Sequence, residues 1–173
     1  TRKLLKVLSY PLAAPSANIS TKVSAVSKKD VRDEFGNKLK IILDGGISKI
    51  GLESTIISLI GKPKVLRLGG IEINKISKIL NNKIKYKKKL KNVTVPGQGK
   101  LHYSPGLKLR LNVNKPKMHE AFILIQKRKI SDKNYFYLTK NKNLKEAGKN
   151  LYKKIKMVKK LKYKRISIEK IPS

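Results

Sequence analysis

Residues 144–161 read LKEAGKNLYKKIKMVKKL, and this stretch predicts a basic amphipathic helix. Apolar residues three and four apart share one face of a helix, and here the expected inward residues are Leu151, Ile155, Val158 and Leu161. Short runs rich in β-branched and aromatic residues surround this helix and predict strands. The expected strands are 107–113, 121–125, 135–138 and 163–168. Strands that alternate with helices indicate an α/β domain.

The same alternation is found earlier in the chain. The apolar spacing from Leu4 to Leu8 predicts a short helix that Pro11 stops. Ser27 lies three residues before Asp30, which predicts the start of a second helix, with Val31 and Phe35 inward and Gly36 after its end. The strands expected next are 40–43, 55–60 and 64–68, followed by an amphipathic helix with Ile73, Ile76, Ile79 and Leu80 on one face.

A change of composition separates these two parts. Residues 83–91 read KIKYKKKLK and hold six lysines in nine positions. Residues 95–106 read VPGQGKLHYSPG and contain two prolines and three glycines, which favours a linker or an ordered loop. We therefore expect three units, and their ranges are 1–82, 83–105 and 106–173.

The composition excludes several kinds of site. The 173 residues include no cysteine, so a disulfide scaffold, a thiolate zinc site and a cysteine nucleophile are ruled out. The two histidines, His102 and His119, spell out no metal cage, and the ten carboxylates are scattered rather than paired. No apolar run reaches the roughly 20 residues of a membrane helix, and no signal peptide is visible. A cytoplasmic protein without a membrane anchor is the expectation.

The formal charge of +33 has two interpretations. Clustered lysines neutralise phosphates and release counterions, which favours a nucleic-acid partner. Alternatively, abundant Lys, Ile and Asn reflect drift toward AT-rich codons, since lysines are spread over the whole chain. Arginine, the residue suited to bidentate phosphate and base contacts, occurs only six times. Weak, salt-sensitive RNA contact is compatible with both interpretations.

Polar loops at strand ends are the candidate functional residues. Pro15 precedes Ser16, Ala17 and Asn18, so a preformed loop can offer a hydroxyl, an amide and backbone N–H groups to an anion. A second loop holds Ser54 just before a strand. Each of these residues is, taken alone, more often part of a turn than of a site.

Two further features point to an anionic ligand. Arg67 is an arginine in a lysine-dominated chain, which indicates a planar, bidentate role, and Gly69 and Gly70 follow it closely. His102 and Tyr103 lie within the segment rich in Pro and Gly. A tyrosine on such a loop can stack on a base or close a pocket, and the alternative is that it fastens the loop to the first domain.

Seven motifs in order carry a more specific signal than any one alone. They are PLAAPSAN (11–18), Ser24, LDGG (43–46), GLESTIISL (51–59), VLRLGGI (65–71), PGQ (96–98) and HYSP (102–105). Together they resemble the threonylcarbamoyl-AMP synthase family with its YrdC-like domain, in the long form that carries a linker and a second domain. Residues 150–172 resemble that second domain near its end.

The resemblance implies an α/β fold. It consists of the C-terminal half of a YrdC-like twisted mixed-sheet domain, a linker and a small Rossmann-like α/β domain that is truncated at its end. The family's N-terminal half supplies the Lys and Arg cluster for the triphosphate and part of the threonine pocket, and no such segment precedes Thr1 here. We therefore expect a C-terminal piece of the enzyme that is inactive by itself.

The resemblance also implies a reaction. The family forms threonylcarbamoyl-adenylate from L-threonine, bicarbonate and ATP, with Mg²⁺ expected through the phosphates, and releases pyrophosphate. tRNA-threonylcarbamoyl transferase proteins use the product to modify an adenosine in tRNA. Orientation and charge stabilisation would drive the chemistry, with no covalent nucleophile and no protein metal site.

Family binding positions carry over residue by residue. The positions that match ATP contacts are Ser16, Asn18, Ser24, Arg67 and Tyr103, and those that match threonine contacts are Ala14 and Ser54. The segment 95–106 would fold over the nucleotide as a lid, with Tyr103 near Ser16, Asn18 and Arg67. The alternative is a linker that is merely docked between the domains.

Two other functions stay open at this point. One is a non-catalytic YrdC-like protein that binds double-stranded RNA, and the other is a degenerate paralogue with a structural role. An RNA-binding role would not require Ser54 or Arg67 in their motifs. Aromatic residues make up 6% of the chain and are not interleaved with the basic runs, unlike a stacking platform for single strands.

Overall fold

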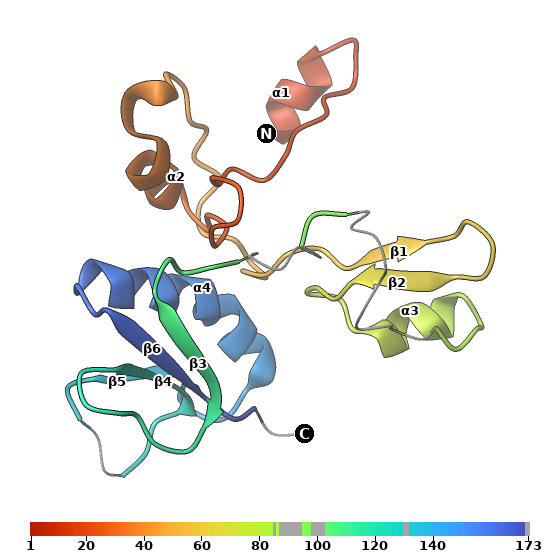
Figure 1. Cartoon of the computed structure of the whole chain (residues 1–173). Coiled ribbons are helices and arrows are strands. Elements are labelled where there is room, and N and C mark those ends of the chain that lie inside the picture. Colours follow the sequence, from red (N-terminus) through yellow and green to blue (C-terminus); the bar gives the residue numbers. More distant parts are fainter. Residues whose placement is uncertain (85, 87–94, 98–102, 130–131, 172–173) are drawn as a thin grey trace.

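The computed structural model describes residues 1–84, 86, 95–97, 103–129 and 132–171 (Figure 1). The first part contains the helices α1 (Arg2–Val7) and α2 (Lys28–Phe35), the short 3₁₀ helix η1 (Gly36–Lys38), the strands β1 (Ile56–Ser58) and β2 (Lys64–Arg67), and the helix α3 (Ile73–Ile79). The second part contains β3 (Lys108–Val113), β4 (Ala121–Gln126), β5 (Tyr135–Thr139), α4 (Leu144–Lys160) and β6 (Arg165–Glu169).

A four-stranded parallel sheet forms the second part. Its strand order is β3-β6-β4-β5, and every neighbouring pair is parallel. In this register Phe122 lies opposite Tyr135, and Ala121 lies opposite Ile166. The five residues from Ala121 to Ile125 are all buried, as expected of a central strand in a parallel sheet covered on both faces. The α/β architecture expected for this part is confirmed.

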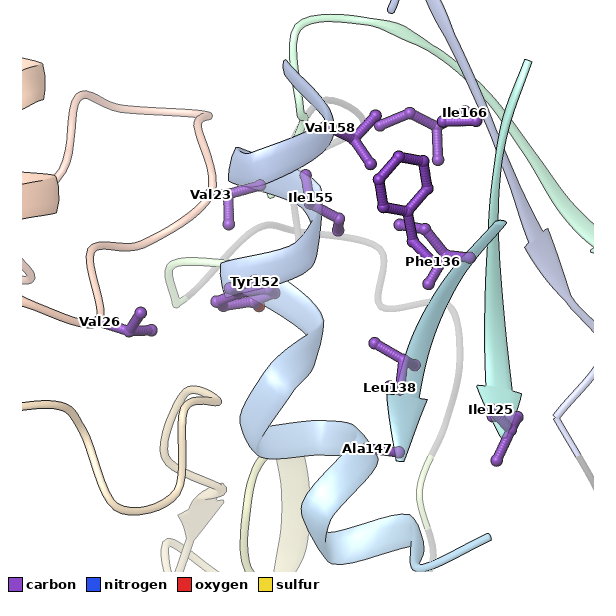
Figure 2. Close-up of a cluster of buried hydrophobic side chains, with 12 residues drawn as sticks. Val23, Val26, Ile125, Phe136, Leu138, Ala147, Tyr152, Ile155, Val158 and Ile166 are labelled. Atoms are coloured by element: carbon purple, nitrogen blue, oxygen red, sulfur yellow. The ribbon is translucent and has the colours of Figure 1, made fainter. Parts of the chain in front are cut away.

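Helix α4 lies between this sheet and the first part of the chain (Figure 2). Phe136 and Leu138 of β5 pack on one side of it, whereas Val23 and Val26 belong to the first part and join the same core cluster. Tyr152, Ile155 and Val158 are the central buried residues of the helix. The two parts therefore share one hydrophobic core.

Leu161 was expected on the inward face of this helix, and that prediction is wrong, because the side chain is 53% exposed. Leu161 is the C-cap residue, and its N–H still donates to the Met157 carbonyl at 3.0 Å, so the helical turn continues to this position but lies past Val158, the last buried residue of the helix. Leu151 is partly buried against the core, as expected.

The elements of the first part are shorter and more open. Strands β1 and β2 pair antiparallel, within the two ranges expected, and α3 follows them. None of the helices α1, α2 and α3 has a buried residue. Large apolar side chains, including Leu4, Leu5, Val7, Leu43 and Ile79, are exposed here. Local sequence signals were therefore enough to predict these helices and strands, although the three helices bury no residue.

The strand expected at residues 40–43 does not form. This stretch has no regular structure, and Ile41 is 82% exposed. A strand needs a neighbour for its backbone hydrogen bonds, and no described segment pairs with residues 40–43. Residues 40–43 are an apolar run, as the sequence shows, but no described strand lies beside them to pair with.

Helix α2 begins and ends at the expected residues. The Ser27 Oγ accepts a hydrogen bond from the Asp30 N–H at 3.2 Å, as an N-cap does. The Asp30 carboxylate accepts from the Val26 N–H at 3.0 Å, one residue before the usual partner of a capping box. Gly36, with φ of 54°, follows the last helical residue. Within the described ranges, no helix is long and apolar enough to cross a membrane.

Candidate functional site

Arg67 is the centre of the candidate site. It is the last residue of β2, and its side chain is 12% exposed. The guanidinium Nε donates to the Ser54 carbonyl at 3.0 Å, and Nη2 donates to the Ser54 Oγ at 2.9 Å. Nη1 donates to the Pro96 carbonyl and to the Tyr103 Oη, both at 3.2 Å. The planar fork of arginine makes such a set of directed bonds possible, whereas lysine could not reproduce it.

A chain of side chains connects Arg67 to the small-residue loop. The Glu53 carboxylate lies 3.9 Å from Arg67 Nη2 and accepts a hydrogen bond from the Ser24 hydroxyl. The Ser24 hydroxyl is also 3.3 Å from the Asn18 Oδ1, while the Asn18 amide donates to the Lys22 carbonyl at 3.1 Å. We call Asn18, Ser24, Glu53, Ser54, Arg67 and Tyr103 the Arg67 cluster.

Close backbone packing explains why residues 53–55 take this position. A Cβ on Gly69 would collide with the backbone of Glu53, Ser54 and Thr55, so only glycine fits there. The Gly70 N–H donates to the Glu53 carbonyl at 2.8 Å, which ties the end of β2 to this loop. The glycine pair therefore positions Ser54 beside Arg67.

The linker closes over Arg67 from both of its described ends. Pro96 and Tyr103 accept hydrogen bonds from the guanidinium, and a Cβ on Gly97 would lie 2.8 Å from Arg67 Cδ. Ser104 is bridged to Lys22 of the first part, and its N–H donates to the Thr21 carbonyl at 2.8 Å. His102 lies outside the described residues.

Backbone strain marks the place where the linker docks. Thr21 and Tyr103 have φ values of 71° and 55°, in the left-handed region that non-glycine residues rarely adopt. Such conformations persist only where the surrounding contacts hold them. Here the Thr21–Ser104 hydrogen bond and the Arg67–Tyr103 contact supply that restraint.

Two tyrosine rings stack beside Arg67. The Tyr103 and Tyr152 rings stack with centroids 6.1 Å apart, and Tyr152 comes from α4. Burial raises the pKa of the Tyr103 hydroxyl above its ordinary value, although Arg67 pulls that pKa down. Burial also raises the pKa of Tyr152. Both phenols are therefore neutral at physiological pH and offer an O–H rather than a second negative charge.

Five of the seven residues expected at the site belong to the Arg67 cluster. They are Asn18, Ser24, Ser54, Arg67 and Tyr103. Ala14 and Ser16 lie in an exposed segment without regular secondary structure and are not members of the cluster. The Ser16 carbonyl accepts from the Asn18 N–H at 3.0 Å, so Ser16 is linked to the cluster through its neighbour's backbone.

Sequence reasoning missed two residues here. Glu53 is the carboxylate within the GLEST motif, and its place beside Ser54 could have suggested a partner for Arg67. Tyr152 gave no such signal, because an aromatic residue on an amphipathic helix is usually part of the core.

Comparison with known families matches both parts of the chain. Residues 1–69 match the family model described as "Telomere recombination", which is the Sua5/YciO/YrdC model. Residues 71–173 match the model of the threonylcarbamoyl-AMP synthase C-terminal domain. The fold is thus a partial YrdC-like domain joined to a second α/β domain with a parallel sheet. The chain belongs to the threonylcarbamoyl-AMP synthase family, in its long form.

Individual relatives agree with this family. The chain is 40% identical over 108 residues to a threonylcarbamoyl-AMP synthase of Pyrococcus abyssi, a match that covers 60% of this chain and 32% of that protein. It is 38% identical over 121 residues to the Schizosaccharomyces pombe enzyme, covering 64% of this chain and 30% of the relative.

A solved relative supports the fold. The crystal structure of P. abyssi Sua5 complexed with L-threonine superimposes with a TM-score of 0.81 at 28% identity. The match covers 96% of this chain and 54% of the solved one. The chain therefore spans about half of the solved structure, and its matches cover about a third of the curated relatives.

Proposed function

We propose that this chain is the part of an L-threonylcarbamoyladenylate synthase that supplies the Arg67 cluster and the linker over it. The reaction would join threonine, bicarbonate and ATP to form threonylcarbamoyl-AMP and pyrophosphate, and the product would serve tRNA modification by tRNA-threonylcarbamoyl transferase proteins. The single observation that carries the proposal is the Arg67 cluster, in which polar residues from four separate motifs meet around one guanidinium.

We assign Arg67 to the phosphates of ATP. Pro96 and Tyr103 use the two protons of Nη1 in the structure, so an arriving phosphate would have to replace them. The linker would therefore open for the nucleotide and close afterwards, with Tyr103 returning toward the nucleotide. Ser16, Asn18 and Ser24 would contribute further polar groups on the ATP side.

We assign Ser54 and Ala14 to threonine. Ser54 lies beside Arg67, so the amino acid and the nucleotide would share one pocket and react without a covalent intermediate. Among the described side chains, no group of three or more His, Asp or Glu could hold a metal ion. Mg²⁺ would accordingly be carried by the phosphates of ATP.

The test is a binding titration in the full-length enzyme that contains this chain. Arg67→Ala should weaken ATP binding by about 1.5–3 kcal/mol, the cost of losing charge-assisted hydrogen bonds. Arg128→Ala is the matched control, because Arg128 pairs with Glu169 in the second domain and should leave ATP binding unchanged. Equal ATP affinity in Arg67→Ala and wild type would reject the role of Arg67.

A second candidate function is RNA binding without catalysis, which the charge of +33 favours. In that case Arg67 would be a clamp that fastens the linker, since most of its N–H groups already bond to the protein. Affinity for a duplex RNA would fall steeply with salt and would be insensitive to Arg67→Ala. No adenylate formation by the full-length protein, together with such RNA binding, would favour this alternative.

A further inference from the structure

We propose that Glu53 is a positioning residue of the candidate site, which holds Ser24 and Arg67 in the orientation that receives ATP. This inference rests on the proposed function, because that function assigns Ser24 and Arg67 to the nucleotide. Glu53 matches none of the expected substrate contacts, and its carboxylate would act through its two neighbours without touching a substrate.

The Glu53 carboxylate lies between the two groups that it would position. One oxygen, Oε1, accepts a hydrogen bond from the Ser24 hydroxyl, and the other, Oε2, lies 3.9 Å from Arg67 Nη2. The side chains of Glu53 and Arg67 are 18% and 12% exposed. An ion pair with so little exposure is screened less by water and salt than a surface pair. Glu53 therefore restrains a hydroxyl and a guanidinium at the same time.

The hydroxyl of Ser24 is oriented by acceptors on two sides. The Asn18 amide nitrogen donates to the carbonyls of Ile19 and Lys22, both at 3.1 Å. The Asn18 Oδ1 therefore faces Ser24, at 3.3 Å from the hydroxyl, and Glu53 offers the second acceptor. A serine hydroxyl has one proton to donate. That proton is shared between Asn18 and Glu53, so the hydroxyl of Ser24 does not rotate freely.

The contacts of Arg67 differ in whether they depend on the linker. The hydrogen bonds from Nη1 to Pro96 and Tyr103 belong to the linker and would be lost when it opens for ATP. Glu53 and Ser54 precede β1 and are not part of the linker, so their contacts with Arg67 would remain. We therefore expect Glu53 to keep the guanidinium in place while the Nη1 protons turn to the nucleotide.

The backbone that carries Glu53 is itself fixed. Its carbonyl accepts from the Gly70 N–H at 2.8 Å, and a Cβ on Gly69 would collide with the same oxygen. Arg67, two residues before Gly69, is paired with Ile56 in the β1–β2 ladder. A side chain can position another group only when its own backbone is held. The end of β2 and the loop before β1 meet this condition.

Charge attraction cannot be the role of Glu53 toward ATP. The phosphates are anions, so a carboxylate beside Arg67 opposes their approach. Burial is the main cause of the raised pKa of both Tyr103 and Tyr152, and the negative charge of Glu53 raises each pKa further, so this charge acts across the cluster. Orientation of Ser24 and Arg67 is the role that the contacts support, and it can be separated from charge by substitution.

The experiment is a pair of binding titrations, with ATP and with L-threonine, on the full-length enzyme that contains this chain. Glu53→Met keeps the length of the side chain but removes both oxygens, and it should raise the Kd for ATP about threefold to tenfold, the loss of one oriented hydrogen bond. The Kd for threonine should change much less. Glu53→Gln keeps an oxygen that accepts from Ser24 and should recover most of the ATP affinity. A side chain that only stabilised this loop would change both Kd values together, because Ser54 follows it directly.

Three further variants complete the experiment. Glu53→Asp keeps the charge but withdraws the carboxylate by one methylene, so it should also weaken ATP binding, and it replaces Glu53→Met if that variant does not fold. Glu53→Met should cost less ATP affinity in a Ser24→Ala background than in wild type, because Glu53 acts partly through Ser24. Glu72→Met is the matched control, since Glu72 is an exposed carboxylate just before α3 and outside the cluster. It should leave ATP binding unchanged.

Two results would overturn the role of Glu53. One is ATP binding that Glu53→Met and Glu53→Asp leave unchanged, and the other is a loss of threonine affinity as large as the loss of ATP affinity. Arg67→Ala distinguishes these from failure of the proposed function. If Arg67→Ala weakens ATP binding while the Glu53 variants do not, only the positioning role is wrong. If none of them changes ATP binding, the proposed function fails as well.

Discussion

At the scale of single residues, arginine takes positions that lysine could not fill. Arg67 makes four hydrogen bonds at the candidate site. Arg110 donates through Nε and Nη2 to both oxygens of the Glu120 carboxylate, at 2.9 and 2.7 Å. Both geometries need a planar fork. The sequence singled out Arg67 because it is an arginine in a lysine-rich chain, and its role toward ATP stays a prediction; the sequence gave no such prediction for Arg110.

Ser54 tests the threonine side of the proposed function. In the full-length enzyme, Ser54→Ala should raise the threonine KM more than the ATP KM, because the hydroxyl is assigned to the amino acid. Steady-state kinetics with each substrate varied in turn provide the measurement. Ser58→Ala, at the far end of β1, is a matched control. A larger rise in the ATP KM would place Ser54 on the nucleotide instead.

Glu120 gives the second domain a dependence on acid pH. Hydrogen bonds from Arg110, then from the Lys117 N–H, lower the pKa of its carboxyl to about 2. A carboxyl whose pKa is lower in the folded state stabilises the fold above its unfolded pKa, and this contribution disappears as pH falls toward 2. Urea unfolding measured between neutral pH and about pH 2 should therefore show a loss that Glu120→Gln removes.

The partner variant provides the control for this prediction. At neutral pH, Glu120→Gln and Arg110→Ala should each lower the free energy of unfolding, because each change removes the bidentate pair. The double variant should cost much less than the sum, because both changes remove one interaction. If the losses in stability of the two single variants simply add in the double variant, the ion pair contributes no interaction energy.

At the scale of elements, the linker is the segment whose role depends most on its surroundings. Its composition predicted a linker or an ordered loop, and its contacts with Arg67, Thr21 and Tyr152 show that the described ends are docked. The sequence could not decide between a docked spacer and a lid, since both need the same prolines and glycines. The structure places Tyr103 on Arg67, and the lid itself stays a prediction.

Replacing residues 95–106 with a Gly/Ser chain of equal length tests the lid in the full-length enzyme. Adenylate formation should fall sharply, because Tyr103 and Pro96 could no longer close on the nucleotide and exclude water. Circular dichroism should show an unchanged fold. The single change Tyr103→Phe keeps the ring stack on Tyr152 but removes the hydroxyl, and it should cause a smaller loss. Full activity of the Gly/Ser protein would contradict the lid.

At the scale of the whole molecule, the interface between the two parts is stabilised by close packing of the backbone and by ion pairs. Gly51 is buried with φ of 73°, and a Cβ there would lie 2.8 Å from the Lys149 Cα of helix α4. A Cβ on Gly148 would lie 2.9 Å from the Leu52 side chain. Lys156 and Lys160 of α4 pair with Asp30 and Asp33 of α2. These contacts join the parts without the linker.

Gly51→Ala should therefore weaken the packing at this interface and destabilise the protein. Alanine in the left-handed region costs about 1–2 kcal/mol, and the collision with α4 adds to it, so the free energy of unfolding should fall by clearly more than that. Gly61→Ala is the matched control, because Gly61 has φ of 66° but nothing within 4 Å of its added Cβ. Urea unfolding measures both, and equal losses would show that the approach to Lys149 contributes nothing.

Exposed apolar side chains gather in the first part of the molecule. Leu4, Val7, Ile41 and Ile79 are among them, and the helices there bury no residue. The solved relative, of which this chain covers 54%, extends beyond the matched region.

Local signals in the sequence by themselves determined most of the elements. The ranges of β4, β5 and α4, the Ser27 cap and the end of α2 at Gly36 all follow from side-chain period, capping and glycine, which act within a few residues. The ordered motifs also pointed to the family that the comparisons show.

Only the tertiary structure decided which segments find partners. Residues 40–43 have a strand-like sequence but no neighbour, and Leu161 has a core-like side chain but lies beyond the end of its helix. Glu53 reaches Arg67, and Tyr152 reaches Tyr103, across 14 and 49 positions of sequence respectively. Backbone pairing and side-chain contacts at such separations depend on how the whole chain folds back on itself, which no local period encodes.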